Sequence, residues 1–196
     1  MIRTHIRPAV AATVVLSVLT GVLYPGAVTI ISQFLFPSQA NGSIIRDAKG
    51  RVIGSTLIAQ AFAQPYYFHP RPSAAGAGYD AMVSAGTNKG PTDRKLADTL
   101  IANAVHSAEQ IDHAIPRKIP ADMATSSASG LDPDISPANA LLQVPRVALA
   151  RGVDSARVRT LVEQHVTGRQ FGVLGEPRVN VLQLNMALDR AFPRHT

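Results

Sequence analysis

Residues 9–36 form the longest apolar stretch of the chain and contain no Asp, Glu, Lys, Arg or His. As an α-helix this stretch would be about 42 Å long at about 1.5 Å per residue, and a bilayer core needs about 20 apolar residues. We therefore predict a transmembrane helix, kinked at Pro25-Gly26 because proline removes a backbone donor. The alternative is a cleaved signal peptide, whose apolar region of about 7–15 residues would be much shorter than this one.

Small side chains recur along one line of the predicted membrane helix. Thr13, Ser17 and Gly21 are spaced four residues apart, so they lie on one face of a helix. Small residues at this spacing let a neighbouring membrane helix approach closely. We predict that these three residues contact a partner helix.

The charges around the apolar stretch predict its orientation. Arg3 and Arg7 are the only charged residues among the first 40, and cytoplasmic flanks are enriched in Lys and Arg. We expect residues 1–8 to be a short cytoplasmic N-terminus. Residues 41–196 would then form a periplasmic domain, with the chain anchored in a bacterial inner membrane by a single helix.

The first part of that domain has the pattern of a small sheet and long loops. Ile44–Arg46 and Arg51–Ile58 read as the strands of a hairpin around a turn at Asp47–Gly50. Aromatic residues followed by prolines predict an extended segment over residues 66–73. Residues 74–92 are rich in Gly, Ala and Ser and predict a long loop, either functional or a disordered connection.

Helical periodicity dominates the rest of the chain. It predicts helices from Thr92 to about Ile115, from Ser136-Pro137 to Gly152, from Asp154 to His165, and after Asn180. Ser136, Asp154 and Asn180 are favourable N-cap residues. A short strand is predicted at Asp122–Thr125. The fold class we expect is α+β: one transmembrane helix followed by a single extracytoplasmic domain of several helices and a small β-sheet.

Composition narrows the possible functions. The chain has 196 residues, no Cys, and a net charge of +6. The basic residues are scattered along the sequence, which argues against a nucleic-acid partner. The six His residues have no metal-ligand spacing, and the sequence lacks a Gly-Lys-Ser/Thr phosphate loop. We therefore expect no metal site.

Two motif-like stretches have a structural interpretation. Residues 76–81 spell a dinucleotide fingerprint, but they follow a predicted loop, and the motif works only at a strand-to-helix turn. Residues 132–136 have oxygen side chains at alternate positions, as a calcium loop does, but Pro137 occupies the place of its glycine. Without a visible catalytic pair, the residues predict a binding or assembly role.

Several stretches together resemble the C chain of the Kdp potassium-transporting P-type ATPase family. They follow in order almost to the end of the chain: Tyr67–Ser73, Ser84–Thr92, Ser127–Pro133, Ile135–Pro137, Arg146–Ala148, Ala150–Gly152, Leu174–Leu182 and Leu184-Asn185. Three positions depart from the expected pattern. Asp134 stands where we expect His, Lys89 where we expect an apolar residue, and Pro145 where we expect a helix former.

The resemblance implies an accessory, non-enzymatic subunit of a high-affinity potassium uptake complex. Its partners would be a channel-like potassium-translocating subunit, an ATP-hydrolysing P-type subunit, a small membrane subunit and the lipid bilayer. The Asp-Lys-Thr-Gly phosphorylation motif is absent from this sequence. We favour a role in assembly and in supporting the outer mouth of the potassium path.

Two alternatives remain open at the sequence level. The family is also described as helping nucleotide binding, so the chain would be a catalytic chaperone that contacts ATP directly. Ser129 and Gln143 would then be its polar contacts, and ATP its ligand; otherwise we expect no cofactor. Such contact would require the opposite membrane orientation. The second alternative is a free periplasmic binding domain, which would require signal cleavage.

Overall fold

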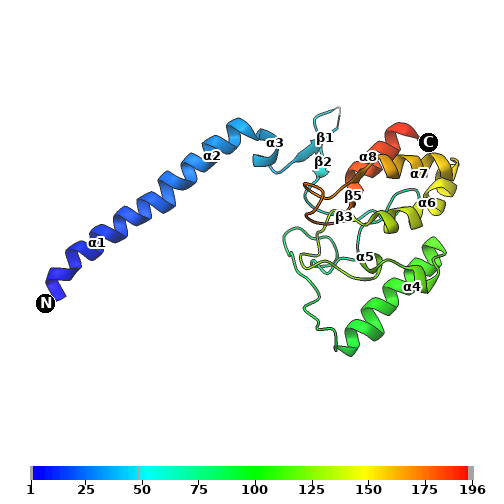
Figure 1. The fold of residues 1–196 in the computed structure, drawn as a ribbon, viewed down its shortest axis with the longest axis horizontal. Coiled ribbons are helices and arrows are strands. Elements are labelled where there is room, and N and C mark those ends of the chain that lie inside the picture. Colours follow the sequence, from blue (N-terminus) through cyan, green and yellow to red (C-terminus); the bar gives the residue numbers. More distant parts are fainter. Residues whose placement is uncertain (1, 48, 194–196) are drawn as a thin grey trace. The chain divides into compact units, whose positions relative to one another are not determined.

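The computed structural model describes residues 2–47 and 49–193. The chain divides into two units, Met1–Ile44 (unit 1) and Ile45–Thr196 (unit 2), which are described separately. Met1 of the predicted N-terminal segment and Ala48 of the predicted hairpin turn lie outside the described residues. Figure 1 shows unit 1 as one long helical run and unit 2 as a mixture of helices and short strands.

Unit 1 is almost entirely helical, and its elements are α1 (Ile2–Val18), a π-helical segment (Leu19–Leu23), α2 (Tyr24–Leu35) and α3 (Pro37–Ala40). A continuous run of 32 residues, Thr4–Leu35, is long and apolar enough to cross a membrane. The turn immediately before Pro25 is π-helical, and the kink at Pro25-Gly26 stays a prediction. There Tyr24 donates its N–H to Leu19 five residues back. Wider turns of this kind occur as single π-bulges inside α-helices.

The strands of the chain form two small antiparallel arrangements. Strands β1 (Ile44–Arg46) and β2 (Val52–Ser55) pair as the expected hairpin, although the second strand is shorter than predicted. Strands β3 (Asp134–Ile135), β5 (Arg178–Asn180) and β4 (Val166–Thr167) form a sheet in the order β3-β5-β4. The prediction of a mixed domain with a small sheet is confirmed.

The described residues of unit 2 also form helical elements: a π-helical segment (Leu96–Ile101), α4 (Ala102–Asp112), a 3-10 turn (Pro116–Lys118), α5 (Ala121–Ala124), α6 (Pro137–Arg151), α7 (Ser155–Gln164) and α8 (Val181–Ala191). The three predicted N-caps are confirmed, since Ser136, Asp154 and Asn180 each accept a backbone N–H. Gly152 ends α6 with a left-handed φ of +64°, which glycine adopts without strain.

The strand predicted at Asp122–Thr125 is wrong, because this segment forms helix α5. Its residues bond to the start of α6 instead of pairing with a strand. The Asp122 carboxylate accepts bonds from Ser136 N, Ser136 Oγ and Asn139 Nδ2 at 2.7, 2.9 and 3.0 Å. The helical conformation of this segment therefore goes with a tertiary contact, in which Asp122 binds Ser136 and Asn139, 14 and 17 residues further along the chain.

The hydrophobic core of unit 2 lies between α6, α7, α8 and strand β5. Its fully or nearly fully buried members are Phe68, Ile135, Ala140, Val144, Val147, Ala148, Val158, Val162, Val179, Val181, Leu184 and Leu188. Phe68 comes from the predicted extended segment. Helix α4 is much less covered: among its described residues only Ala108 is buried. The apolar side chains of α4 are therefore partly exposed.

Candidate functional site

The extended segment around Phe68 pairs with no described strand. Side-chain amides form the hydrogen bonds to its backbone that a neighbouring strand would otherwise form. Asn185 of α8 accepts from Phe68 N at 2.8 Å and donates to Phe68 O at 2.9 Å. Gln143 of α6 does the same for His69, at 2.8 and 3.1 Å. Buried backbone groups must find partners, and these two amides supply them in the manner of a strand pair.

An arginine fixes the start of the same segment. Arg146 of α6 donates through Nη1 to Pro65 O at 2.6 Å and to Tyr67 O at 2.8 Å. Its Nε meets Asp112 of α4 at 2.6 Å, and the two side chains are only 6% and 4% exposed. This buried ion pair links α4 to α6, and the two opposite charges compensate each other in the interior.

The polar residues of α6 follow a helical spacing that the sequence analysis missed. Asn139, Gln143 and Arg146 are separated by four and three residues, so they share one face of the helix. Gln143 Nε2 donates to Asn139 Oδ1 at 2.8 Å, and Arg146 Nη2 donates to Gln143 Oε1 at 2.7 Å. The spacing of three polar residues on a core helix was the signal that could have identified this network.

A cavity of about 400 Å³ lies between α4 and the residues around His69. Leu100, Ala104, Ala108 and Ile111 give it an apolar wall, and the α6 amides line another part of it. His69 also lines it and contacts Gln64 O at 3.1 Å through Nε2. Burial, followed by the nearby Arg146 guanidinium, holds the pKa of His69 below its usual value of 6.5.

The structure does not bring the two proposed ATP contacts together in this cavity. Gln143 is 1% exposed, and both atoms of its amide are bonded within the protein. Ser129 lies in the exposed loop before Leu131, where its Oγ accepts from Leu131 N at 3.1 Å. It is outside the residues that line the cavity. The hydrogen bonds of Gln143 connect α6 to the backbone of His69. Contact of Gln143 and Ser129 with ATP stays a prediction.

The long loop over residues 74–92 packs against a second loop. Ser73 Oγ donates to Gly130 O at 2.6 Å and accepts from Tyr79 N at 2.8 Å. A Cβ at Gly130 would lie 2.5 Å from Ala85 O, and one at Gly86 would lie 2.7 Å from Ala128 O. Glycine is required at both positions because the two backbones approach so closely. The start of this loop is thus a folded part of unit 2.

The small residues predicted to meet a partner helix lie on the uncovered membrane helix. Thr13 Oγ1 donates to Ala9 O at 2.8 Å, so its polar atom is satisfied within the helix. A Cβ at Gly21 would have no neighbour within 4 Å. The chain itself therefore leaves room along this line, and contact with another helix stays a prediction for Thr13, Ser17 and Gly21.

Of the three positions that depart from the expected family pattern, two form ion pairs and the third is exposed. Lys89 forms an ion pair with Asp93 at 3.0 Å. Asp134 meets Arg178 at 3.0 Å, and burial raises the pKa of its carboxyl. Pro145 lies exposed within α6, which continues through it. None of these residues lines the cavity beside α4.

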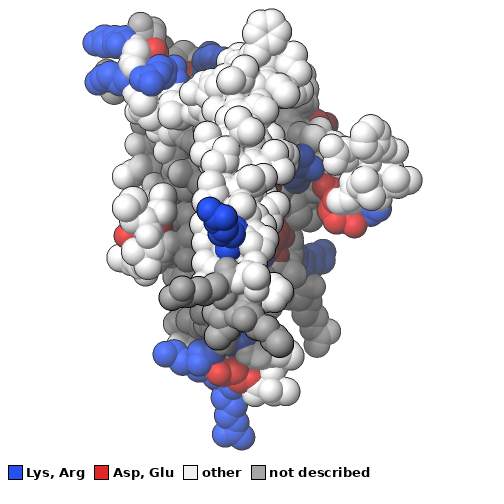
Figure 2. Space-filling model, turned by 90° about the vertical axis from the view of Figure 1, so that its left-hand side faces the viewer, with Lys and Arg blue, Asp and Glu red and all other residues white. Residues whose placement is uncertain are grey.

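Positive charge is dispersed on the face of the protein that Figure 2 shows. Lys and Arg side chains lie there in separate groups, several of them beside Asp or Glu. Ion pairs in the described part of the chain include Arg71–Asp132 and Arg169–Glu176. The absence of a nucleic-acid partner stays a prediction.

These features define the class of protein. Its described residues form one candidate membrane helix and a mixed helix-and-sheet unit whose interior polar residues bind its own backbone. A family model described as "K+-transporting ATPase, c chain" matches residues 6–190. The chain belongs to the KdpC family and is thus an accessory subunit of the K+-transporting ATPase, a complex that contains other subunits.

Relatives from several bacteria support this assignment over nearly the whole length. A "Potassium-transporting ATPase KdpC subunit" of Gemmatimonas aurantiaca is 60% identical over 186 residues, which cover 94% of this chain and 92% of the relative. A protein with the same name from Caulobacter sp. K31 is 54% identical over 193 residues, covering 98% and 96%. One from Myxococcus xanthus is 56% identical over 185 residues, covering 94% and 87%.

Proposed function

We propose that this chain works by contact: it holds the subunits of a potassium uptake complex together and carries out no chemistry of its own. The observation that carries this proposal is the commitment of its buried polar groups to its own backbone. Gln143, Asn185 and Arg146 each bond to the segment around Phe68. ATP hydrolysis and potassium translocation would then belong to the other subunits.

We further propose that unit 2 lies on the periplasmic side and supports the outer mouth of the potassium path. Arg3 and Arg7 favour a cytoplasmic N-terminus, and the candidate span Thr4–Leu35 would then place unit 2 on the other side of the inner membrane. In this orientation an effect on nucleotide affinity would be a coupling between distant sites, transmitted through the membrane subunits.

The test is deletion of the chain from cells that produce the remaining subunits. Potassium-stimulated ATP hydrolysis should be lost, and the other subunits should no longer co-purify in detergent. The control is the same preparation with the chain restored. If the complex assembles normally without the chain and only its affinity for ATP falls, the assembly proposal is wrong and the catalytic chaperone is favoured.

The cavity beside α4 is the observation in favour of that second candidate. It measures about 400 Å³ and includes Gln143 in its wall. If ATP is contacted there, the complete chain should bind it saturably, and Gln143→Ala should weaken that binding. Membership in a family of complex subunits argues against the remaining alternative, a free periplasmic binding domain.

A further inference from the structure

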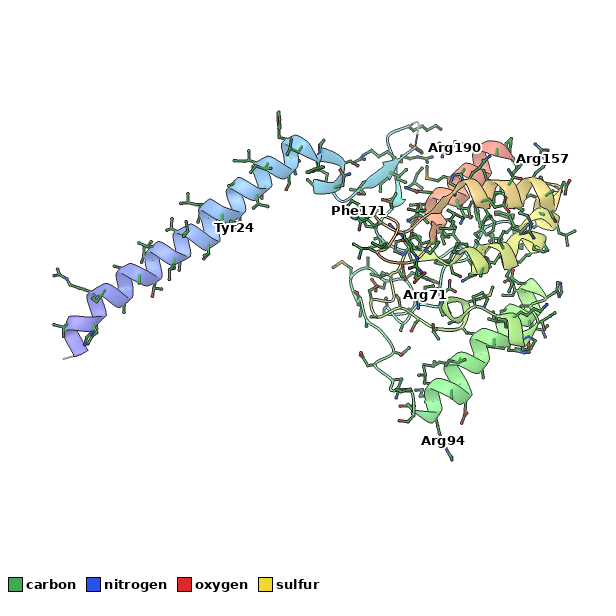
Figure 3. All side chains as sticks on the ribbon, viewed as in Figure 1. Tyr24, Arg71, Arg94, Arg157, Phe171 and Arg190 are labelled. Atoms are coloured by element: carbon green, nitrogen blue, oxygen red, sulfur yellow. The ribbon has the colours of Figure 1, made fainter. Side chains whose placement is uncertain are left out.

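The loop between β4 and β5 exposes three large apolar side chains in four residues. Phe171, Val173 and Leu174 are 87%, 72% and 56% exposed. Figure 3 shows Phe171 at the edge of unit 2. Contiguous apolar side chains at the surface are typical of a contact with another molecule.

The loop has a defined conformation despite its exposure. Gln170 and Leu174 exchange two backbone hydrogen bonds of 2.8 and 2.9 Å, which close its base. Below them Arg169 Nη2 donates to both carboxylate oxygens of Glu176 at 2.9 and 2.7 Å. The three apolar side chains are therefore presented on a closed turn, and little ordering is required when they bind.

Phe171 itself occupies a strained backbone position. Its φ is +53°, in the left-handed region that a bulky side chain rarely adopts. Gly172, the next residue, also has a positive φ, of +77°. A glycine at position 171 would remove the strain, so the fold of the loop does not explain the aromatic side chain. Strain of this kind is characteristic of functional contacts.

We propose that this loop is a docking element, in which Phe171 inserts into an apolar pocket on another protein subunit of the complex. The inference deepens the proposed function, because it names a surface by which the chain makes its contacts. An aromatic residue at the centre of a patch with a polar rim has the composition of an interface anchor. Arg169 and Glu176 supply that rim.

The geometry favours a protein pocket over a lipid surface. A bilayer has no fixed shape to match, so it gives no advantage to a closed and strained turn. The base of the loop is an ion pair without net charge, which provides no attraction to anionic headgroups. A shaped pocket, by contrast, rewards a side chain that is already held in position.

The first test compares Phe171→Gly with Leu149→Ala in the assembled complex. Phe171→Gly should weaken retention of the chain by the other subunits in detergent at least about tenfold, because anchor side chains dominate interface affinity. The melting temperature of the chain should stay the same or rise, since the strain is relieved. Leu149 is 84% exposed on α6, and its variant should keep normal retention.

Retention unchanged by Phe171→Gly would overturn the docking proposal. The broader assembly function would still stand if deletion of the whole chain disperses the complex, so the two failures can be distinguished. A fall in the melting temperature of Phe171→Gly would also overturn it, since that result assigns Phe171 to the fold.

The second test identifies the occupant. A photo-crosslinking amino acid at position 171 in the membrane-embedded complex should form an adduct with another protein subunit, whereas the same group at position 149 should not. An adduct with lipid alone, or no adduct from position 171, would contradict the assignment of a protein pocket.

Discussion

At the scale of single residues, buried amides do the work that a neighbouring strand would otherwise do. Phe68 N and O and His69 N and O are all bonded by side chains of Asn185 and Gln143. This explains why a polar residue such as Gln143 lies in the interior at 1% exposure. Polarity at these positions therefore reflects backbone satisfaction and does not by itself indicate a ligand.

Gln143→Leu should destabilise the folded chain by about 3 kcal/mol, because it leaves the buried N–H and C=O of His69 without partners. Urea unfolding of the full chain in detergent would measure the change. Gln164→Leu, at an exposed position on α7, is the matched control and should change stability little. Unaltered stability in Gln143→Leu would show that the amide is dispensable for the fold.

The stability of the fold should also depend on His69 in mildly acidic solution. The pKa of His69 is lowered in the folded state by burial and by Arg146, so the unfolded chain binds the proton more tightly. The free energy of unfolding should consequently fall as the pH drops below about 6.5. Unfolding curves between pH 7 and pH 5 would measure this.

His69→Asn should flatten that pH dependence, because the variant has no imidazole to protonate. The matched control is His106→Asn on α4, where the side chain is 70% exposed. It should leave the curve close to that of the unmodified chain. If His69→Asn retains the full pH dependence, other groups are responsible for it.

At the scale of elements, the helices differ in how they are held. Helix α6 is covered on two sides, with Val144 and Val147 in the core and Gln143 and Arg146 against the extended segment. Helix α4 is linked to α6 by the Asp112–Arg146 pair and leaves a cavity along its apolar wall. The apolar window of the candidate membrane helix is not buried by any described part of the chain, as expected of a segment that lies in lipid or against partner subunits.

Gly21→Leu should release the chain from the detergent-solubilised complex while leaving it in the membrane. The structure supports this test because a Cβ at position 21 would have no neighbour within 4 Å beyond the backbone of its own helix. A loss of association would therefore report on a neighbouring helix that needs close approach. Co-purification compares the variants, with Val22→Leu as the control on another face; equal co-purification would place the contact elsewhere.

At the scale of the whole molecule, membership in the KdpC family and one candidate span make this a membrane-complex subunit. The orientation that we propose decides which partners unit 2 meets. With the N-terminus in the cytoplasm, unit 2 would lie on the periplasmic side, opposite the cytoplasmic ATP site that we expect on another subunit. The docking loop and the partly open face of α4 would then be available to the outer surfaces of the other subunits.

A reporter fused after Thr196 should be active if it functions only in the periplasm. The expectation follows from Arg3 and Arg7, which lie on one side of a span without other charges. Fusion of a reporter that functions only in the cytoplasm is the control and should be inactive. Activity of the second reporter would reverse the orientation and return direct ATP contact to consideration.

The sequence by itself determined the features whose causes are local. The candidate membrane helix follows from an uncharged apolar run, and the starts of α6, α7 and α8 follow from N-cap side chains that bond within their own first turn. The hairpin followed from its turn. The resemblance to the family, carried by short stretches spread along the chain, is confirmed by the match over residues 6–190.

The tertiary structure decided what depends on residues far apart in the chain. Asp122 lies in a helix because it binds the start of α6, and Gln143 lies inside because it pairs with a backbone 74 residues away. The loop after Ser73 is folded because Gly86 and Gly130 let two backbones touch. The exposed position of Phe171 likewise depends on its left-handed φ of +53°, which the sequence does not reveal. Local patterns carry no information about such partners, since each contact exists only once the chain has folded.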